Sequence, residues 1–279
     1  MNTFRTALLL TALTLIFILI GAALGGRSGM IFAFVLAVGM NFFSYFYSDK
    51  LVLRMYNARE TSEYESPWLF QTVRELTMRA GIPMPKVYII PTDQPNAFAT
   101  GRNPEHAAVA VTEGIVRVLN REELAGVLAH EIAHVKNRDI LIGTLAATIA
   151  GAISMIANMA QWALMFGGRS DERDVHPAVA VVMMLVAPIA AMLVQMAISR
   201  AREYQADRTG AELTRNPDSL ARALVKIHSA AAGIPMNAEP ATAHMFIVSP
   251  LTGSDFASLF STHPPVEKRV EALRKLLFT

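Results

Sequence analysis

Four stretches of the chain contain no Asp, Glu, Lys or Arg over a length that spans a bilayer. These are residues 6–26, 28–48, 140–168 and 175–199. A helix needs about 20 such residues to cross the hydrocarbon core of a membrane. Only Arg27 separates the first two stretches. The pattern therefore predicts four transmembrane helices in two hairpins, the first within residues 1–48 and the second at 140–199.

A signal peptide is the alternative for the first stretch, because Arg5 precedes an apolar run. A buried core helix is the alternative for each of the others. The first run is long for a signal peptide, and a second run of spanning length follows it at once. The chain is also 53% hydrophobic with a mean hydropathy of +0.35, more apolar than an ordinary soluble enzyme. Both observations favour membrane anchors.

Positive charges predict the orientation of these helices, since Lys and Arg accumulate on the cytoplasmic side. The two short loops contain three, and the opposite side contains nine. The loop residues are Arg27, Arg169 and Arg173; those opposite are Arg5, Lys50, Arg54, Arg59, Lys136, Arg138, Arg200, Arg202 and Arg208. We therefore expect both termini and the polar segments to be cytoplasmic. The lipid bilayer is an expected partner. Nucleic acid is not, because the net charge is only +2 and the chain lacks a phosphate-binding loop.

The polar remainder, residues 49–139 and 200–279, is long enough for one domain into which 140–199 is inserted. Capping residues and apolar spacing predict helices, and runs of Val, Ile and Ala predict strands. The expected helices are 66–83, 120–139, 216–233 and 263–278; the expected strands are 86–92 and 106–116, with loop residues between them and an irregular stretch at 234–261. The fold class is thus α+β and mostly helical.

The sequence HEIAH, residues 130–134, predicts a metal site on one of these helices. His130 and His134 are four residues apart, so they lie on one helical face and can bind one zinc ion. Glu131 can accept a proton from a zinc-bound water, whose pKa the metal lowers to about 7. The alternative is a solvated helix face without a metal. The apolar neighbours Leu128, Ile132 and Val135 argue against that alternative.

A catalytic zinc ion needs a third protein ligand and keeps one position open. His134 lies six residues before the third apolar run, and Glu203 lies four residues after the fourth. If 140–199 forms an antiparallel hairpin, both residues lie roughly 6 to 9 Å from the same membrane face. We therefore predict Glu203 as the third ligand, with one Zn²⁺ per chain. The absence of cysteine argues against a closed structural zinc site.

Asp207 lies four residues after Glu203, on the same helical face. A ligating histidine usually donates its other N–H group to a carboxylate, and we predict this role for Asp207. The alternative is an ordinary surface ion pair with Arg202 or Arg208. His244, in the irregular stretch, has no role that the sequence decides.

The sequences HEIAH, EYQAD and STHPPVEKR together resemble the HtpX-type membrane metalloproteases, which are gluzincins related to the CAAX prenyl proteases. The resemblance extends over the whole chain. It implies a gluzincin-like zinc endopeptidase of the bacterial cytoplasmic (inner) membrane that removes misfolded or damaged membrane proteins under stress. Matching the motifs gives His130, His134 and Glu203 as ligands, Glu131 as the base and Asp207 as the carboxylate behind a ligand.

The resemblance adds two further expectations. His263 would stabilise the oxyanion of the transition state, as an additional His or Tyr does in gluzincins; otherwise it is a helix-entry residue. Asn96, Ala97 and Phe98 would form an edge strand on which an extended peptide docks. Otherwise they form a loop in which Phe98 packs on the core.

Two other functions compete with a protease of membrane or other polypeptide substrates. One is the same chemistry on a narrow substrate such as a lipidated C-terminus, although four spans are few for a large enclosed chamber. The other is a membrane scaffold with a structural zinc ion, which would normally show four protein ligands. The sequence leaves the substrates and the oligomeric state open.

The predicted organisation is therefore in four parts. They are a transmembrane hairpin at 1–48, the first part of the metalloprotease domain at 49–139, a second hairpin at 140–199, and the second part of the domain at 200–279.

Overall fold

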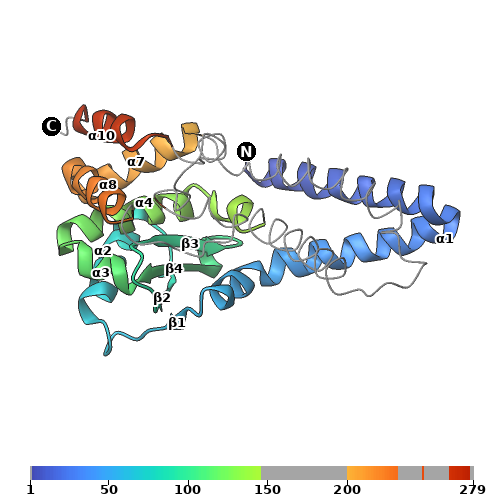
Figure 1. Cartoon of the computed structure of the whole chain (residues 1–279), viewed down its shortest axis with the longest axis horizontal. Helices are drawn as coiled ribbons and strands as arrows, with labels where there is room; N and C mark the ends of the chain where they lie inside the picture. Colours follow the sequence, from blue (N-terminus) through green and yellow to red (C-terminus); the bar gives the residue numbers. More distant parts are fainter. Residues whose placement is uncertain (1, 146–199, 232–246, 248–263, 277–279) are drawn as a thin grey trace, which may run out of the picture.

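The computed structural model describes residues 2–145, 200–231, 247 and 264–276. This part of the chain is mostly helical and contains one small sheet (Figure 1). The helices are α1 (Asn2–Met55), α2 (Pro67–Ala80), α3 (Glu113–Val118), α4 (Arg121–Lys136), α7 (Arg200–Thr214), α8 (Pro217–Ala231) and α10 (Val266–Arg274), with a 3-10 turn, η1, at Pro104–His106. The strands are β1 (Arg59–Glu60), β2 (Lys86–Ile90), β3 (Ala97–Gly101) and β4 (Ala107–Thr112).

The helix α1 is a hairpin of two antiparallel arms, because its backbone turns at Gly26, where φ is +56° (Figure 1). The side-chain amide of Asn41 donates a hydrogen bond to the hydroxyl of Thr14 on the other arm, at 2.8 Å. A Cβ atom at Gly29 would lie 2.2 Å from the carbonyl oxygen of Gly21, so the absence of side chains lets the arms approach closely.

Within the described ranges, one helix is long and apolar enough to cross a membrane, the arm Gly25–Met55. Its surface exposes large apolar side chains, among them Phe32, Val35, Phe42 and Phe43. Such a surface is unfavourable in water and suits contact with lipid. The second predicted hairpin lies outside the described residues except for its helical start at 140–145, so a count of four helices stays a prediction.

The sheet has the strand order β1-β2-β4-β3, which places β3 at an edge. The central pair, β2 and β4, is parallel, and both outer strands run antiparallel to their neighbours. One face, including Val109 and Val111, packs in the main core with α2, α4 and α8. The other face, including Phe98, packs against Val52 and Leu53 at the end of α1. The apolar arm of α1 is therefore joined directly to the sheet.

Three features of the sheet differ from the sequence prediction. The predicted strand 106–116 ends at Thr112, and α3 follows, because the Thr112 hydroxyl accepts a hydrogen bond from the Ile115 N–H and caps a helix. The segment predicted as loop contains β3, whose small residues have a low strand propensity and are ordered by pairing with β4. The short strand β1 was also not predicted.

The predicted helix ends are largely confirmed. In α2, Gly81 adopts the left-handed conformation at the C-terminus (φ 70°), although the Ser66 side chain makes no capping bond. In α4, Asn120 and Glu123 form a reciprocal capping box. The helices α8 and α10 lie within the predicted ranges, and α10 is shorter than its predicted range.

Candidate metal centre

The helices α4 and α7 pack against each other and carry the three predicted ligands. They approach closely at Gly210, where a Cβ atom would lie 2.9 Å from the backbone nitrogen of His130. A glycine at this position lets the two backbones come together. The contact therefore sets how far Glu203, two turns earlier on α7, lies from the histidines.

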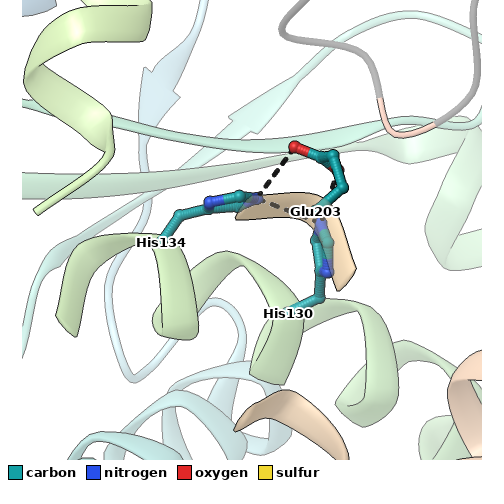
Figure 2. Close-up of side chains that lie close together, drawn as sticks. All are labelled: His130, His134 and Glu203. Carbon is teal, nitrogen blue, oxygen red and sulfur yellow. Dashed lines mark hydrogen bonds and ion pairs between the residues drawn. The ribbon is translucent and has the colours of Figure 1, made fainter. Parts of the chain in front are cut away.

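His130, His134 and Glu203 form one cluster, with one ligand atom from each within 4.8 Å of the others (Figure 2). The two Nε2 atoms are 3.2 Å apart. The two carboxylate oxygens of Glu203 lie 3.6 Å from the Nε2 atoms, one facing each histidine. Ligand atoms about 2.0 to 2.1 Å from a tetrahedral zinc ion are about 3.4 Å apart, so this donor set fits zinc. The structure thus brings together residues that are 69 positions apart in the sequence.

His130 is held from behind by a buried ion pair. Its Nδ1 atom lies 2.9 Å from Asp207 Oδ1. Asp207 accepts two hydrogen bonds from the guanidinium of Arg269, at 2.6 and 2.8 Å, and Arg269 is fully buried. Burial alone would raise the pKa of Asp207, but the charge and hydrogen bonds of Arg269 lower it to about 2. The carboxylate is therefore ionised and accepts from the histidine N–H.

The alternative partners considered for Asp207 are wrong. Arg208 pairs with Glu212 at 3.1 Å on the exposed side of α7. Arg202 lies 4.0 Å from Asp139. The actual partner of Asp207 is Arg269, 62 positions away in the sequence.

His134 has a different carboxylate behind it, Asp139, whose Oδ2 atom lies 3.3 Å from the histidine Nδ1 atom. Burial disfavours the charged imidazolium. The hydrogen bond to Asp139 and the nearby charges of Glu203 and Glu131 nevertheless raise the pKa of His134 to about 9. Both ligand histidines thus direct Nδ1 to a carboxylate and Nε2 to the cluster.

Glu131 lies between the cluster and the edge strand. Its Oε2 atom accepts a hydrogen bond from the backbone N–H of Ala99 at 2.9 Å. Burial raises the pKa of Glu131, and the electrostatic influence of the neighbouring His130 and His134 partly opposes this shift. A buried carboxylate with a raised pKa beside a metal-ligand cluster is suited to taking up and returning a proton.

Comparison with known proteins gives relatives over almost the whole chain. It is 58% identical over 275 residues to a protease HtpX homolog of Desulfatibacillum aliphaticivorans, covering 98% of this chain and 89% of the relative. It is 57% identical to a protease HtpX homolog of Pyrococcus furiosus, covering 98% of this chain and 95% of the relative. Residues 63–277 match the model of peptidase family M48.

The chain belongs to peptidase family M48. This M48 chain is therefore an HtpX-type metalloprotease, a hydrolase of peptide bonds, and its relatives and apolar helix indicate a membrane protein. The crystal structure of S. mikatae Ste24p has a similar fold, with a TM-score of 0.54 and 19% sequence identity. The match covers 98% of this chain and 65% of that chain, so Ste24p is considerably longer.

The segment of this M48 peptidase that was predicted to dock a peptide, residues 96–98, lies in the protein interior. Ala97 opens the edge strand β3, as the resemblance implied. Phe98 points into the sheet core, 3% exposed, with its ring 5.9 Å from that of Tyr56. Asn96 is also buried, and its side-chain oxygen accepts from the Ile247 N–H at 3.0 Å. Only the backbone of β3, and not the Phe98 side chain, can therefore meet a peptide at the edge.

Two residues of this site were missed in the sequence, and two predicted ones lie outside the described part of the chain. Arg269 is within the STHPPVEKR motif, and its signal was a basic residue on the buried face of a short helix. Asp139 follows the catalytic helix, and its signal was a carboxylate five residues after a ligand. His263 and His244 fall outside the described residues.

Proposed function

We propose that this M48 peptidase is a zinc-dependent endopeptidase that cleaves misfolded or damaged membrane proteins, as part of membrane-protein quality control under stress. The observation that carries the proposal is the cluster of His130, His134 and Glu203, with Glu131 between it and an edge strand. We further propose four transmembrane helices in a bacterial inner membrane, with the catalytic domain and both termini cytoplasmic.

The same three side chains would hold one zinc ion. Two neutral imidazoles and one carboxylate form a donor set that suits zinc and leaves a coordination position open. When bound, the ion would polarise the substrate carbonyl and make water a nucleophile at neutral pH. The carboxylate of Asp207 would keep the Nδ1 atom of His130 protonated, so that its Nε2 atom faces the ion.

Glu131 moves the proton in this proposal. Its carboxylate takes a proton from the attacking water as the new C–O bond forms. It then gives the proton to the amide nitrogen as the C–N bond breaks. The Ala99 N–H holds Oε2 in place, and the raised pKa of Glu131 favours the protonated form that the second step needs.

The substrate would add to the outer edge of β3, the last strand of the sheet in the described part of the chain, as an extended strand. Thr112 donates its N–H to the Asn96 carbonyl, so by the alternation of an antiparallel ladder Ala97, Ala99 and Gly101 direct their N–H and C=O groups away from β4. The Ala99 N–H donates to Glu131 and the Gly101 N–H to the Thr144 hydroxyl, so the Ala97 N–H and the carbonyl groups would bind the peptide, without regard to its side chains. This mode suits a protease of unfolded segments. His263 remains our proposed oxyanion donor.

The site also lies close to the apolar arm of α1. The sheet packs on Val52 and Leu53, at the end of that arm, and Arg102 of the β3–η1 connection lies 5.2 Å from the ring of Phe46. A peptide at the edge of β3 would therefore be near the membrane surface, which supports membrane proteins as substrates.

The substitution Glu131→Gln tests this function. We expect kcat on an unfolded test protein to fall about 10²- to 10⁴-fold while bound zinc stays at one equivalent, since only the proton carrier is lost. The measurement compares full-length wild type and variant in detergent, with the metal content determined in both. Glu122→Gln is the matched control, because Glu122 lies on the same helix with its side chain 72% exposed.

Equal cleavage by wild type and Glu131→Gln would show that another mechanism or a contaminant is responsible. If neither cleaves the test protein although zinc is firmly bound, the broad-specificity proposal is wrong. The narrow protease for lipidated C-termini and the non-catalytic scaffold would then be the remaining functions.

A further inference from the structure

The end of the catalytic helix places a second carboxylate against the metal cluster. The helix α4 stops at Lys136, and Arg138 adopts the left-handed conformation, with φ +58°. The Asp139 N–H then donates to the His134 carbonyl at 2.9 Å, and a new helix begins at Ile140. This turn brings the Asp139 carboxylate beside the His134 ring, 3.3 Å from Nδ1.

Asp139 also faces Arg202, the residue before the ligand Glu203. The Asp139 Oδ1 atom lies 4.0 Å from Arg202 Nε, and each side chain is only 9% exposed. This ion pair therefore links two of the proposed ligands. Asp139 contacts His134 on α4, and Arg202 directly precedes Glu203 on α7. A pair with so little exposure is less screened by water than a surface pair, so it restrains the two helices more.

We propose that Asp139 is a positioning residue of the metal centre, and that Arg202 holds it in place. Asp139 keeps the Nδ1 atom of His134 protonated and its ring oriented, so that Nε2 faces the metal. Arg202 links this support to the segment that carries Glu203. The inference rests on the proposed zinc site and adds two residues to it that no motif match assigned.

The test must distinguish positioning of His134 from simple helix capping, because Asp139 occupies the N-cap position of the helix that starts at Ile140. Ser and Asn are both good N-cap residues. The variant Asp139→Ser keeps the cap but is too short to reach His134. The variant Asp139→Asn keeps the cap and an acceptor oxygen but loses the charge. A capping role alone predicts little change in either variant.

The experiment measures zinc affinity of the full-length protein in detergent by competition with a chelator, and the visible absorption spectrum of the Co²⁺-loaded form. We expect Asp139→Ser to weaken zinc binding about 10- to 100-fold and to alter the Co²⁺ spectrum. Asp139→Asn should weaken it less. Arg202→Met should also have a smaller effect, because Asp139 keeps its contact with His134. The double variant Asp139→Ser/Arg202→Met should bind zinc no more weakly than Asp139→Ser alone.

The pair of Asp218 and Arg222 provides the matched control, since it is also an Asp–Arg ion pair but half-exposed on α8. Asp218→Ser and Arg222→Met should leave zinc affinity within about twofold of wild type, as surface pairs contribute little. If wild type binds zinc tightly and both Asp139 variants bind it equally well, Asp139 is only a helix cap and the inference is wrong. If wild type itself binds no zinc, the proposed function fails together with the inference.

Discussion

The two histidines of the candidate metal cluster lie on one helix, yet they are supported in different ways. The support of His130 is tight: Asp207 lies 2.9 Å from its ring, and Arg269 binds that carboxylate through two hydrogen bonds. The support of His134 is looser, with Asp139 at 3.3 Å and Arg202 at 4.0 Å. The His130 side chain is 1% exposed, whereas that of His134 is 14% exposed.

This difference follows from burial. A carboxylate that is wholly removed from water is stable only with a well-oriented cation, and Arg269 supplies this from α10. Asp139 keeps some solvent and tolerates a longer contact. The comparison indicates that His130 is held by the core of the domain, whereas His134 is held where the domain meets the apolar segment 140–199. The His130 half of the site is therefore the more firmly fixed half, and the His134 half is the more loosely held one.

The substitution Arg269→Met tests the fixed half and should have the largest effect. It leaves Asp207 buried without its cation, which we expect to destabilise the fold by about 3 to 5 kcal/mol. Denaturant unfolding in detergent would measure the change. Arg202→Met should cost less because its partner is partly solvated, and Arg222→Met on the surface should cost under about 1 kcal/mol. An Arg269→Met loss no greater than that of Arg202→Met would contradict the comparison.

The more loosely held half of the site, at His134, should make zinc binding depend on pH. Because the pKa of His134 is raised to about 9, the metal-free imidazole is protonated below that pH, and zinc must displace the proton. Affinity should therefore rise about tenfold per pH unit up to about pH 9 and level off above it. Calorimetry at pH 7 in buffers of different ionisation enthalpy should detect about one released proton per zinc ion. Identical heats in all buffers at pH 7 would count against a protonated His134.

The close contact of α7 with α4 should matter for the metal as well as for the fold. Gly210→Ala places a Cβ atom 2.9 Å from the His130 nitrogen, and we expect a loss of about 1 to 3 kcal/mol in stability with weaker zinc binding. Gly126→Ala is the control on α4, the helix that carries His130, since its Cβ atom would lie 2.7 Å from the backbone nitrogen of Leu220 on α8. It should lower stability while leaving zinc affinity unchanged. Equal zinc affinity in the two variants would show that Gly210 has only a packing role.

The parts of the site that could be predicted from sequence depend on regular geometry. Helical spacing relates His130 to His134, and the expectation of a hairpin at 140–199 relates His134 to Glu203. The parts that could not be predicted depend on tertiary contacts. Arg269 meets Asp207 only because α10 packs against α7 and α8, and no local pattern indicates that meeting.

The same distinction explains the fold. Asn120 begins a helix through a capping box that the sequence shows directly. The strand β3 has no such local signal, because Ala97 and Gly101 are poor strand formers and pair only in the presence of β4. Asp139 reaches His134 only because Arg138 adopts a left-handed turn, which a non-glycine residue seldom does.

The hydrogen bond from the Ala99 N–H to Glu131 also has a consequence for inhibitor design. A peptide mimic that places a carbonyl opposite Ala99 must first displace the Glu131 carboxylate from that N–H group. A compound could instead donate a hydrogen bond to Glu131 and bind a metal ion at the cluster through a neighbouring oxygen. Such a compound would leave the hydrogen bond between the Ala99 N–H and Glu131 intact. Selective inhibitors of this protein should therefore be sought among metal-binding groups that carry their own N–H or O–H donor.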